Sequence, residues 1–332
     1  MSDLRTLTPR EAVEILDSMD RVVITCHVRP DGDTLGTAKA LAVMLRMLGK
    51  EARITCADPV PERLSFIMEE GDFADPEELA PLCREGGWRT VAVDVASPSQ
   101  WGRLGELLPT PELVIDHHAM NIPFAPHFTV AEASSASEAL WQVAREYIAD
   151  GRLTLTAELA LPMYTAISSD TGCFRFSNVT PDTLRIAAEL MEAGIDGAKV
   201  NRLLFDAKPI EQLRAEAFIG SSLQRILGGA VAYAVITLRD TEELGFGYEH
   251  FETAIDVVRS LRGVEIAFVL KEVAPGEYKA SLRSTDRDVA AVAAVFGGGG
   301  HLRAAGCTVR AESKELAAEA VISALDRATR LQ

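Results

Sequence analysis

Histidine and aspartate residues gather in four short segments within the first 170 residues of the chain. The segments are HVRPDGD (His27, Asp31 and Asp33), Asp94 at the end of TVAVD, Asp116-His117-His118 at the end of LVID, and Asp170 in AISSDTG. Carboxylates and imidazoles form an oxygen-rich ligand field that suits Mn²⁺ or Mg²⁺, and also Zn²⁺. The set is too large for one metal with an open position, but it fits two. Two metal ions about 3.5–4 Å apart can hold a bridging hydroxide and stabilise an in-line displacement at phosphorus.

Each segment alone has an ordinary structural explanation. A PDGD sequence is typical of a turn, an aspartate after a strand often caps a helix, and paired histidines can be satisfied within a fold. Their combination favours a functional site, because each segment ends a predicted strand or follows an apolar run. Ligand sites of open α/β sheets form at the carboxyl ends of the strands, where such segments converge.

The elements that must position these residues follow from the hydrophobic pattern. Short apolar runs alternate with helical patterns, which predicts a mainly parallel sheet with flanking helices. We expect strands at residues 21–28, 52–57, 90–95 and 112–116, and helices at 8–19, 34–48, 158–168 and 182–191. This region, residues 1–195, is the first predicted domain.

The rest of the chain predicts a linker and a second domain. Residues 196–226 have a wholly helical pattern and contain Pro209. Residues 227–332 predict a smaller α/β domain with strands at 231–238, 265–271, 278–284 and 305–309. Its helices are expected at 251–262, at 289–296 and at the end of the chain, with a glycine-rich loop at 297–300.

The composition of the 332 residues excludes several classes of protein. With 48% hydrophobic and 25% charged residues, the chain is not disordered, collagen-like or a coiled coil. A formal charge of −16 argues against binding to long duplex nucleic acid, which depends on neutralising many phosphates. We expect a cytoplasmic protein, since neither a membrane span nor a signal peptide is apparent. The five cysteines have no CxxC spacing and are interpreted as structural.

The motifs resemble those of a known family. HVRPDGDTLGT, VAVD, VIDHHAMN and SSDTGCFRFSN, in this order, resemble the motifs of the DHH phosphoesterases. The segment SLRSTDRDVAAVAAVFGGGGHLRAAG resembles the DHH-associated domain of the first type. The resemblance spans nearly the whole chain. It is strongest with the bacterial nano-RNases, the bifunctional oligoribonucleases and 3′-phosphoadenosine-5′-phosphate (pAp) phosphatases.

The resemblance implies a role for each residue of the four segments. A first metal ion would be held by His27, Asp31 and Asp94, and a second by Asp33, Asp94, His117 and Asp170. Two Mn²⁺ ions are expected, with Mg²⁺ or Co²⁺ as alternatives. His118 would face the scissile phosphate as phosphate binder or general acid, and Asp116 would orient an imidazole. Asn121 matches a polar residue that follows the DHH motif.

In the second domain, a run of four glycines is by itself typical of a flexible turn. The resemblance instead implies that this domain binds the nucleotide end of the substrate, with the active site in the cleft between the domains. The implied residues are Arg283, Ser284, Gly298, Gly299, Gly300 and His301, with Arg262 and Arg303 as weaker candidates. Two histidines outside the motifs, His127 and His250, are expected at the surface, and Trp88, Trp101 and Trp141 in the core.

The resulting hypothesis is a metal-dependent hydrolase of phosphoric esters. It would cleave short 5′-phosphorylated oligonucleotides to mononucleotides, as an exoribonuclease, and pAp to AMP, by two-metal hydroxide attack on phosphorus. Alternatives are a cyclic-dinucleotide phosphodiesterase and a pyrophosphatase or polyphosphatase of the same superfamily. A non-enzymatic alternative is a nucleic-acid-binding module, since a similar loop domain is appended to alanyl-tRNA synthetases. Relatives are often dimers, so a homodimer is compatible with the resemblance.

Overall fold

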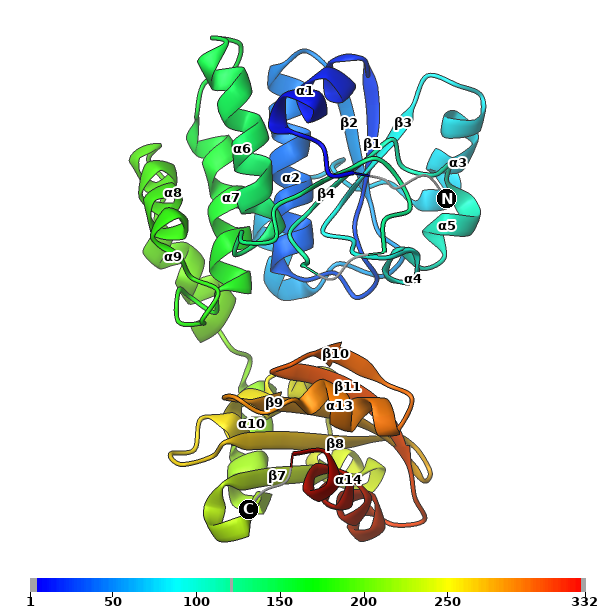
Figure 1. Cartoon of the computed structure of the whole chain (residues 1–332), viewed down its shortest axis with the longest axis vertical. Helices are drawn as coiled ribbons and strands as arrows, with labels where there is room; N and C mark the ends of the chain where they lie inside the picture. Colours follow the sequence, from blue (N-terminus) through cyan, green and yellow to red (C-terminus); the bar gives the residue numbers. More distant parts are fainter. Residues whose placement is uncertain (1–4, 120–121, 330–332) are drawn as a thin grey trace. The chain divides into compact units, whose positions relative to one another are not determined.

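The computed structural model of the chain describes residues 5–119 and 122–329. Asn121 therefore lies outside the described residues. The chain divides into two compact units, Met1–Ala207 and Lys208–Gln332 (Figure 1). Within the described ranges, no helix is both long and apolar enough to cross a membrane.

The first unit contains a five-stranded, wholly parallel sheet with the order β2-β1-β3-β4-β5. Its strands are β1 (Arg21–Thr25), β2 (Glu51–Thr55), β3 (Arg89–Val93), β4 (Leu113–Asp116) and β5 (His127–Thr129). The four predicted strands are thus confirmed, although the first three end two or three residues earlier than predicted, at Thr25, Thr55 and Val93. The parallel arrangement brings the carboxyl ends of β1, β3 and β4 to one edge of the sheet.

Helices cover both faces of this sheet. The helices of this unit are α1 (Pro9–Asp17), α2 (Gly32–Met47), α3 (Pro76–Arg84), α4 (Pro98–Trp101), α5 (Leu104–Leu107), α6 (Ala136–Ala149), α7 (Ala157–Asp170), α8 (Pro181–Glu192) and α9 (Gly197–Asn201), with a 3₁₀-helix over Glu62–Ile67. Of these, α8 and α9 pack against α7 (Figure 1). Successive strand residues point to opposite faces, so Ile24 packs with residues of α1, α2, α6 and α7. Its neighbour Val23 packs with α3 and with Trp101 and Leu104 on the other face. Trp101 and Trp141 are buried, as expected.

One prediction for this unit is wrong. His127, expected at the surface, begins β5 and is 7% exposed. The short sequence HFT extends the sheet beside β4, and the chain near Thr6 bridges to its outer side. These tertiary contacts bury a histidine that lies outside every sequence motif.

The second unit contains a six-stranded mixed sheet with the order β10-β11-β9-β8-β7-β6. Its strands are β6 (Gln224–Ile226), β7 (Val231–Ile236), β8 (Ile266–Ala274), β9 (Glu277–Ser284), β10 (Gly299–His301) and β11 (Ala304–Arg310). Its helices are α10 (Ile210–Ser222), α11 (Leu238–Leu244), α12 (Ala254–Arg259), α13 (Val289–Val295) and α14 (Lys314–Thr329), with 3₁₀-helices over Leu227–Gly229 and Tyr248–Phe251. One hydrophobic core lies under α13 and α14, and another under α10 and α12. This is the smaller α/β domain that the sequence predicts.

Residues 196–226 are less uniformly helical than expected. A π-helix over Arg202–Asp206 follows α9, and the helix is then interrupted before α10. Pro209 stands at the N-cap of α10, and proline disfavours helical backbone at the residue before it. Residues Gln224–Ile226 form β6, because their backbone pairs with β7.

The glycine-rich segment also differs from the expected loop. Residues Gly299–His301 form strand β10, which pairs with β11. At Gly298, an added Cβ would lie 2.2 Å from the carbonyl oxygen of Gly306, so a side chain would clash with the neighbouring backbone. The glycines therefore permit close strand pairing at this edge of the sheet.

Candidate metal centre

His27 and Asp31 are positioned between β1 and α2. Asp31 is the N-cap of α2, and its Oδ1 atom accepts hydrogen bonds from the backbone N–H groups of Asp33 (3.0 Å) and Thr34 (3.1 Å). His27 contacts the carbonyl oxygen of Val28 through Nδ1 at 2.8 Å. Its Nε2 atom therefore faces the carboxylates and lies 3.5 Å from Asp31 Oδ1. The capping sequence that starts α2 thus also sets the geometry of these two side chains.

Asp33 lies in the first turn of α2 and is buried. Its carboxylate accepts hydrogen bonds from the backbone N–H groups of Ala136 (2.7 Å) and Ser137 (3.3 Å), at the start of α6. The hydroxyl of Thr37 donates a third, at 3.0 Å. Backbone donors and the positive end of the α6 dipole stabilise a carboxylate at this position.

The segment Ser134–Ser137, which supplies these donors, was missed in the sequence analysis. Ser135 is the N-cap of α6 and accepts a hydrogen bond from the N–H of Glu138. The S-x-x-E pattern is a sequence signal for a helix start. It could have located the helix, although not its contact with Asp33.

Asp94 follows β3 at the centre of the cluster and is 3% exposed. Its backbone is left-handed, with φ of 58°, a conformation that aspartate tolerates better than most residues. Oδ2 lies 3.3 Å from Nε2 of His27, and Oδ1 lies 3.6 Å from Nε2 of His117. Oδ1 is buried and has no hydrogen-bond partner among the described residues. The two oxygens of one carboxylate therefore face two different groups of ligand atoms.

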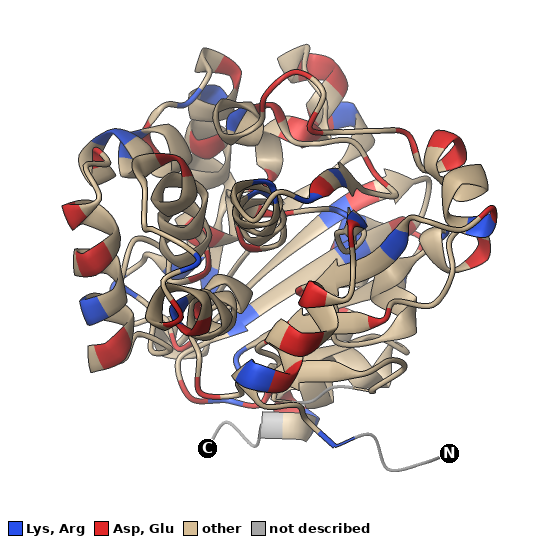
Figure 2. Cartoon of the chain, turned by 90° about the horizontal axis from the view of Figure 1, so that it is seen from above, with Lys and Arg blue, Asp and Glu red and all other residues tan. Residues whose placement is uncertain are grey.

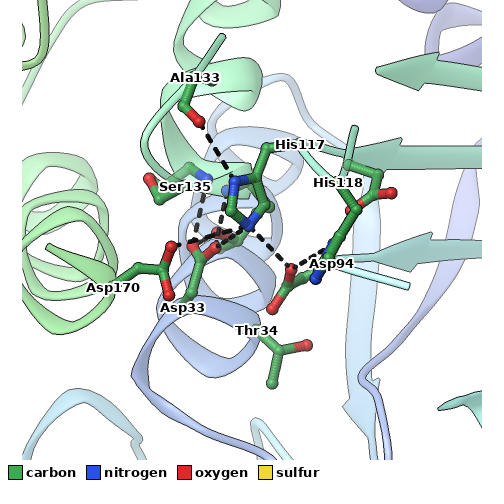
Figure 3. A network of polar contacts seen from close by, with 12 residues as sticks. Asp33, Thr34, Asp94, His117, His118, Ala133, Ser135 and Asp170 are labelled. Carbon is green, nitrogen blue, oxygen red and sulfur yellow. Dashed lines mark hydrogen bonds and ion pairs between the residues drawn. The ribbon is translucent and has the colours of Figure 1, made fainter. Parts of the chain in front are cut away.

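His117 and Asp170 complete the second group (Figure 3). His117 contacts the carbonyl oxygen of Ala133 through Nδ1 (3.3 Å), and its Nε2 lies 3.6 Å from Asp33 Oδ2 and 3.8 Å from Asp170 Oδ2. Asp170 is the last residue of α7, so a helix end joins the strand ends at this site. The contact at Nδ1 leaves Nε2 directed towards the carboxylates, as is typical of metal-binding histidines.

Among residues 5–119 and 122–329, the structure assembles three groups of metal-ligand type, whose ligand atoms lie within 4.8 Å of one another in each group. The groups are His27, Asp31 and Asp94; Asp33, His117 and Asp170; and Asp94, His117 and His118. All six residues predicted as metal ligands are therefore brought together.

The electrostatics of this cluster favour a bound cation. Burial and the charges of Asp94 and Asp170 raise the pKa of Asp33 well above its ordinary value. Burial, together with Asp94 and Asp31, raises the pKa of Asp170 to about 7, against the effect of His117. For His27, burial lowers the pKa, but hydrogen bonds with Asp31 and Asp94 raise it to about 12 overall. Buried carboxylates that repel one another, and an Asp94 Oδ1 that accepts no hydrogen bond from the described residues, fit divalent cations with hard oxygen and nitrogen ligands.

His118 and Asp116 form a separate pair at the edge of the cluster. Nδ1 of His118 lies 2.8 Å from Oδ1 of Asp116, and 3.6 Å from Oδ1 of Asp94. Burial lowers the pKa of His118, but the hydrogen bond with Asp116 and the charge of Asp94 raise it to about 9. Asp116 itself belongs to none of the three ligand groups. Its position fits the orientation of an imidazole.

The residues predicted to bind substrate lie together in the second unit. Arg283 on β9 is opposite Ala304 on β11, and Gly299 and Gly300 on β10 are opposite Gly306 and Ala305. The Ser284 N–H donates to the carbonyl oxygen of Arg303 at 3.0 Å. Gly298 directly precedes β10, and His301 ends it. The pairing of β9, β11 and β10 therefore gathers all six residues at one part of this sheet.

Comparison with known proteins extends these observations. The model of the DHH family, N-terminal domain, matches residues 21–167, and that of the DHHA1 domain matches residues 228–327. The bifunctional oligoribonuclease and PAP phosphatase NrnA of Thermus thermophilus is 34% identical, over 95% of this chain and 93% of its own length. The corresponding protein of Bacillus subtilis is 26% identical, over 90% and 92%. The crystal structure of an exopolyphosphatase-related protein from Bacteroides fragilis superimposes with a TM-score of 0.88 at 22% identity, covering 96% of this chain and 95% of that one, which shows a shared fold.

Proposed function

Because the chain belongs to the DHH family and carries a DHHA1 domain, we propose that it is a metal-dependent phosphoesterase of short oligonucleotides. Its substrates would be 5′-phosphorylated nano-RNA, cleaved to mononucleotides, and pAp, cleaved to AMP. Relatives named as oligoribonuclease and PAP phosphatase cover nearly the whole chain. The observation that carries the proposal is the carboxylate of Asp94, whose two oxygens face separate groups of ligand atoms.

We assign two divalent ions to these groups. His27, Asp31 and Asp94 would hold the first, and Asp33, Asp94, His117 and Asp170 the second. Mn²⁺ suits this mixture of carboxylate and imidazole ligands, with Mg²⁺ and Co²⁺ as alternatives. When bound, such ions supply Lewis-acid stabilisation of a phosphoryl group and lower the pKa of an attacking water.

His118 is the proposed acid or phosphate binder. Asp116 accepts the hydrogen bond of Nδ1–H and so fixes the tautomer and the direction of the ring. A proton held by this imidazole can be donated to a phosphate oxygen or to the leaving oxygen. Asp116 acts only through His118, as a positioning residue.

The second domain is proposed to hold the nucleotide. Arg283 would bind phosphate through its guanidinium group, and Ser284, Gly298, Gly299, Gly300 and His301 would contact the phosphate or sugar.

The catalytic part is assigned to residues 1–195 and the substrate-binding part to 227–332, joined by 196–226. Acidic and basic residues are scattered over the helices and loops (Figure 2), and the formal charge is −16. This charge suits a short substrate better than a long duplex.

We also assign the protein to the cytoplasm. A homodimer is compatible with the family, and light scattering of the purified chain tests for it.

The decisive experiment follows mononucleotide release from a 5′-phosphorylated RNA dinucleotide and phosphate release from pAp, each with Mn²⁺ and with a chelator. Turnover that the chelator abolishes supports the proposal, and the ratio of kcat/KM values ranks the two substrates. Absence of turnover of both substrates by the Mn²⁺-loaded protein contradicts it.

A further inference from the structure

His127 contains a buried ring nitrogen that none of the described residues satisfies. The residue is 7% exposed, and its Nδ1 atom has no hydrogen-bond partner in the part of the chain that the structure describes. Leaving a buried polar atom unpaired costs about 1–3 kcal/mol. Proteins commonly satisfy such atoms with an internal water molecule where there is room.

A partly open cavity, with room for about one water molecule, lies beside this histidine. Its volume is about 10 Å³, and it is lined by Asp116, His127 and Thr129 with an apolar wall that includes Val114 and Phe124. A volume of roughly 10–15 Å³ is what one water requires. Val114 pairs with His127, and Asp116 with Thr129, so these four side chains share one face of the parallel sheet.

Asp116 supplies the second polar group at this cavity. It is 1% exposed, and its Oδ1 accepts the hydrogen bond from His118. A carboxylate offers about four acceptor positions, so this bond leaves Asp116 able to accept another. We infer that the cavity holds one water molecule, which accepts a hydrogen bond from Nδ1–H of His127 and donates one to the carboxylate of Asp116.

This water makes His127 a positioning residue for His118. The hydrogen bonds run from His127 through the water to Asp116 and then to His118, and they hold the Asp116 carboxylate in the rotamer that orients the imidazole. The inference rests on the role proposed for His118. Residues that hydrogen-bond directly to a ligating side chain typically contribute about 10–100-fold to activity. His127 acts from further out, so we expect an effect at the lower end of this range.

The water and the tautomer are tested without any activity measurement. A high-resolution crystal structure of the full chain should show a water within hydrogen-bond distance of both His127 Nδ1 and the Asp116 carboxylate. In ¹⁵N NMR spectra, His127 should carry its proton on Nδ1. An empty cavity, or protonation of His127 at Nε2 alone, overturns the inference even if the chain hydrolyses dinucleotides.

Two substitutions test the effect on His118. The amide of His127→Asn lies near the position of Nδ1, whereas that of His127→Gln lies near Nε2. We expect His127→Gln to lower kcat about 10-fold or more with KM little changed, and to shift the NMR signal of the His118 Nδ1 proton. His127→Asn should retain most of the activity.

The matched control is Phe128→Leu, which alters the next residue of β5 on the opposite face of the sheet. It should change stability and leave the His118 signal in place. Equal kcat for His127→Gln and the unchanged chain, or an equal loss in both His127 variants, contradicts a positioning role. If His127→Gln does not fold, the activity of His127→Asn and the crystal structure of the unchanged chain still test the inference.

Discussion

The carboxylate of Asp33 accepts a hydrogen bond of 2.7 Å from the backbone N–H of Ala136, 103 residues further along the chain. The starts of helices α2 and α6 therefore meet at one carboxylate. Donors from α6 favour its charged form, but burial and the charges of Asp94 and Asp170 outweigh them and raise its pKa. The fold thus holds a hydrogen-bonded carboxylate whose charged form a bound cation would stabilise further.

The substitution Asp33→Asn should separate metal binding from folding. Removing one of several like charges should offset the loss of one acceptor for the donors from α6, so the melting temperature of the metal-free protein should change little. The increase in Tm on addition of Mn²⁺ should be lost, and hydrolysis should fall by about 100-fold or more. Thermal scans with and without Mn²⁺ measure both effects. Asp182→Asn, at an exposed residue of α8, is the control and should keep the full Mn²⁺ response.

Asp94→Ala should remove both metal ions, because Asp94 faces both ligand groups. We expect fewer than one bound Mn²⁺ per chain by elemental analysis, no measurable hydrolysis, and an unchanged circular dichroism spectrum. Asp31→Ala, which alters one group only, should retain more metal. Activity of the Asp94→Ala variant would contradict the proposed site.

Metal binding should release protons. The pKa of His27 is raised to about 12 and that of Asp170 to about 7, so in the metal-free protein His27 carries a proton and Asp170 does so in part at neutral pH. Metal ions bind the deprotonated forms, so apparent affinity should rise as pH increases. Titration calorimetry with Mn²⁺ in two buffers of different ionisation enthalpy measures the protons released. Asp170→Asn should release fewer, and heats that do not depend on the buffer would contradict this prediction.

The sequence predicted which residues lie together in this cluster better than it predicted the contacts that position them. His27, Asp94 and His117 follow apolar strands. In open α/β sheets, residues that follow parallel strands meet at the edge where the carboxyl ends of the strands lie. The contact of Asp33 with α6 could not be predicted, because its donors are backbone groups that leave no residue-type signal. The burial of His127 depends on the pairing of a three-residue strand with its neighbours, and strand β10 likewise depends on its partner. Local sequence does not specify such short, tertiary pairings.

A buried ion cluster formed by α2 and Asp72 should contribute to the stability of the first unit. Asp72 is 2% exposed and accepts hydrogen bonds of 2.7 Å from Lys39 and from Arg46. Asp72→Asn leaves the buried Lys39 ammonium group with the exposed Glu69 carboxylate, at 3.2 Å, as its counter-charge. The cost should therefore be about 3 kcal/mol at pH 7, the lower end of the range for a broken buried ion pair. All three tryptophans lie in the first unit, so denaturant unfolding followed by tryptophan fluorescence reports on this unit.

The difference in unfolding free energy between the unchanged protein and Asp72→Asn should shrink as pH falls. Burial raises the pKa of Asp72. The hydrogen bonds from Lys39, the N–H of Glu69 and Arg46 together lower it by more than burial raises it, so the folded-state pKa lies below the ordinary value. The stabilisation is therefore present above the unfolded pKa of about 3.9 and is lost as pH falls through the folded value. Unfolding curves of the two proteins should converge in acid. A constant difference down to about pH 3 would contradict the assignment, and Asp182→Asn should change stability by less than about 1 kcal/mol throughout.

Arg283→Ala should affect substrate binding more than the chemical step. Burial lowers the pKa of Arg283, with Asp256 opposing this effect and Arg259 adding to it. A partly desolvated guanidinium gains more from an anionic phosphate than an exposed one does. Losing one such hydrogen bond, worth about 1.5–3 kcal/mol, should raise KM for a 5′-phosphorylated dinucleotide about 10-fold or more, with kcat less affected. Arg310→Ala is the matched control, since Arg310 lies on β11 at the far end of the same strand pair and contacts Glu277. If KM is unchanged in Arg283→Ala, or rises equally in both variants, Arg283 does not bind the phosphate.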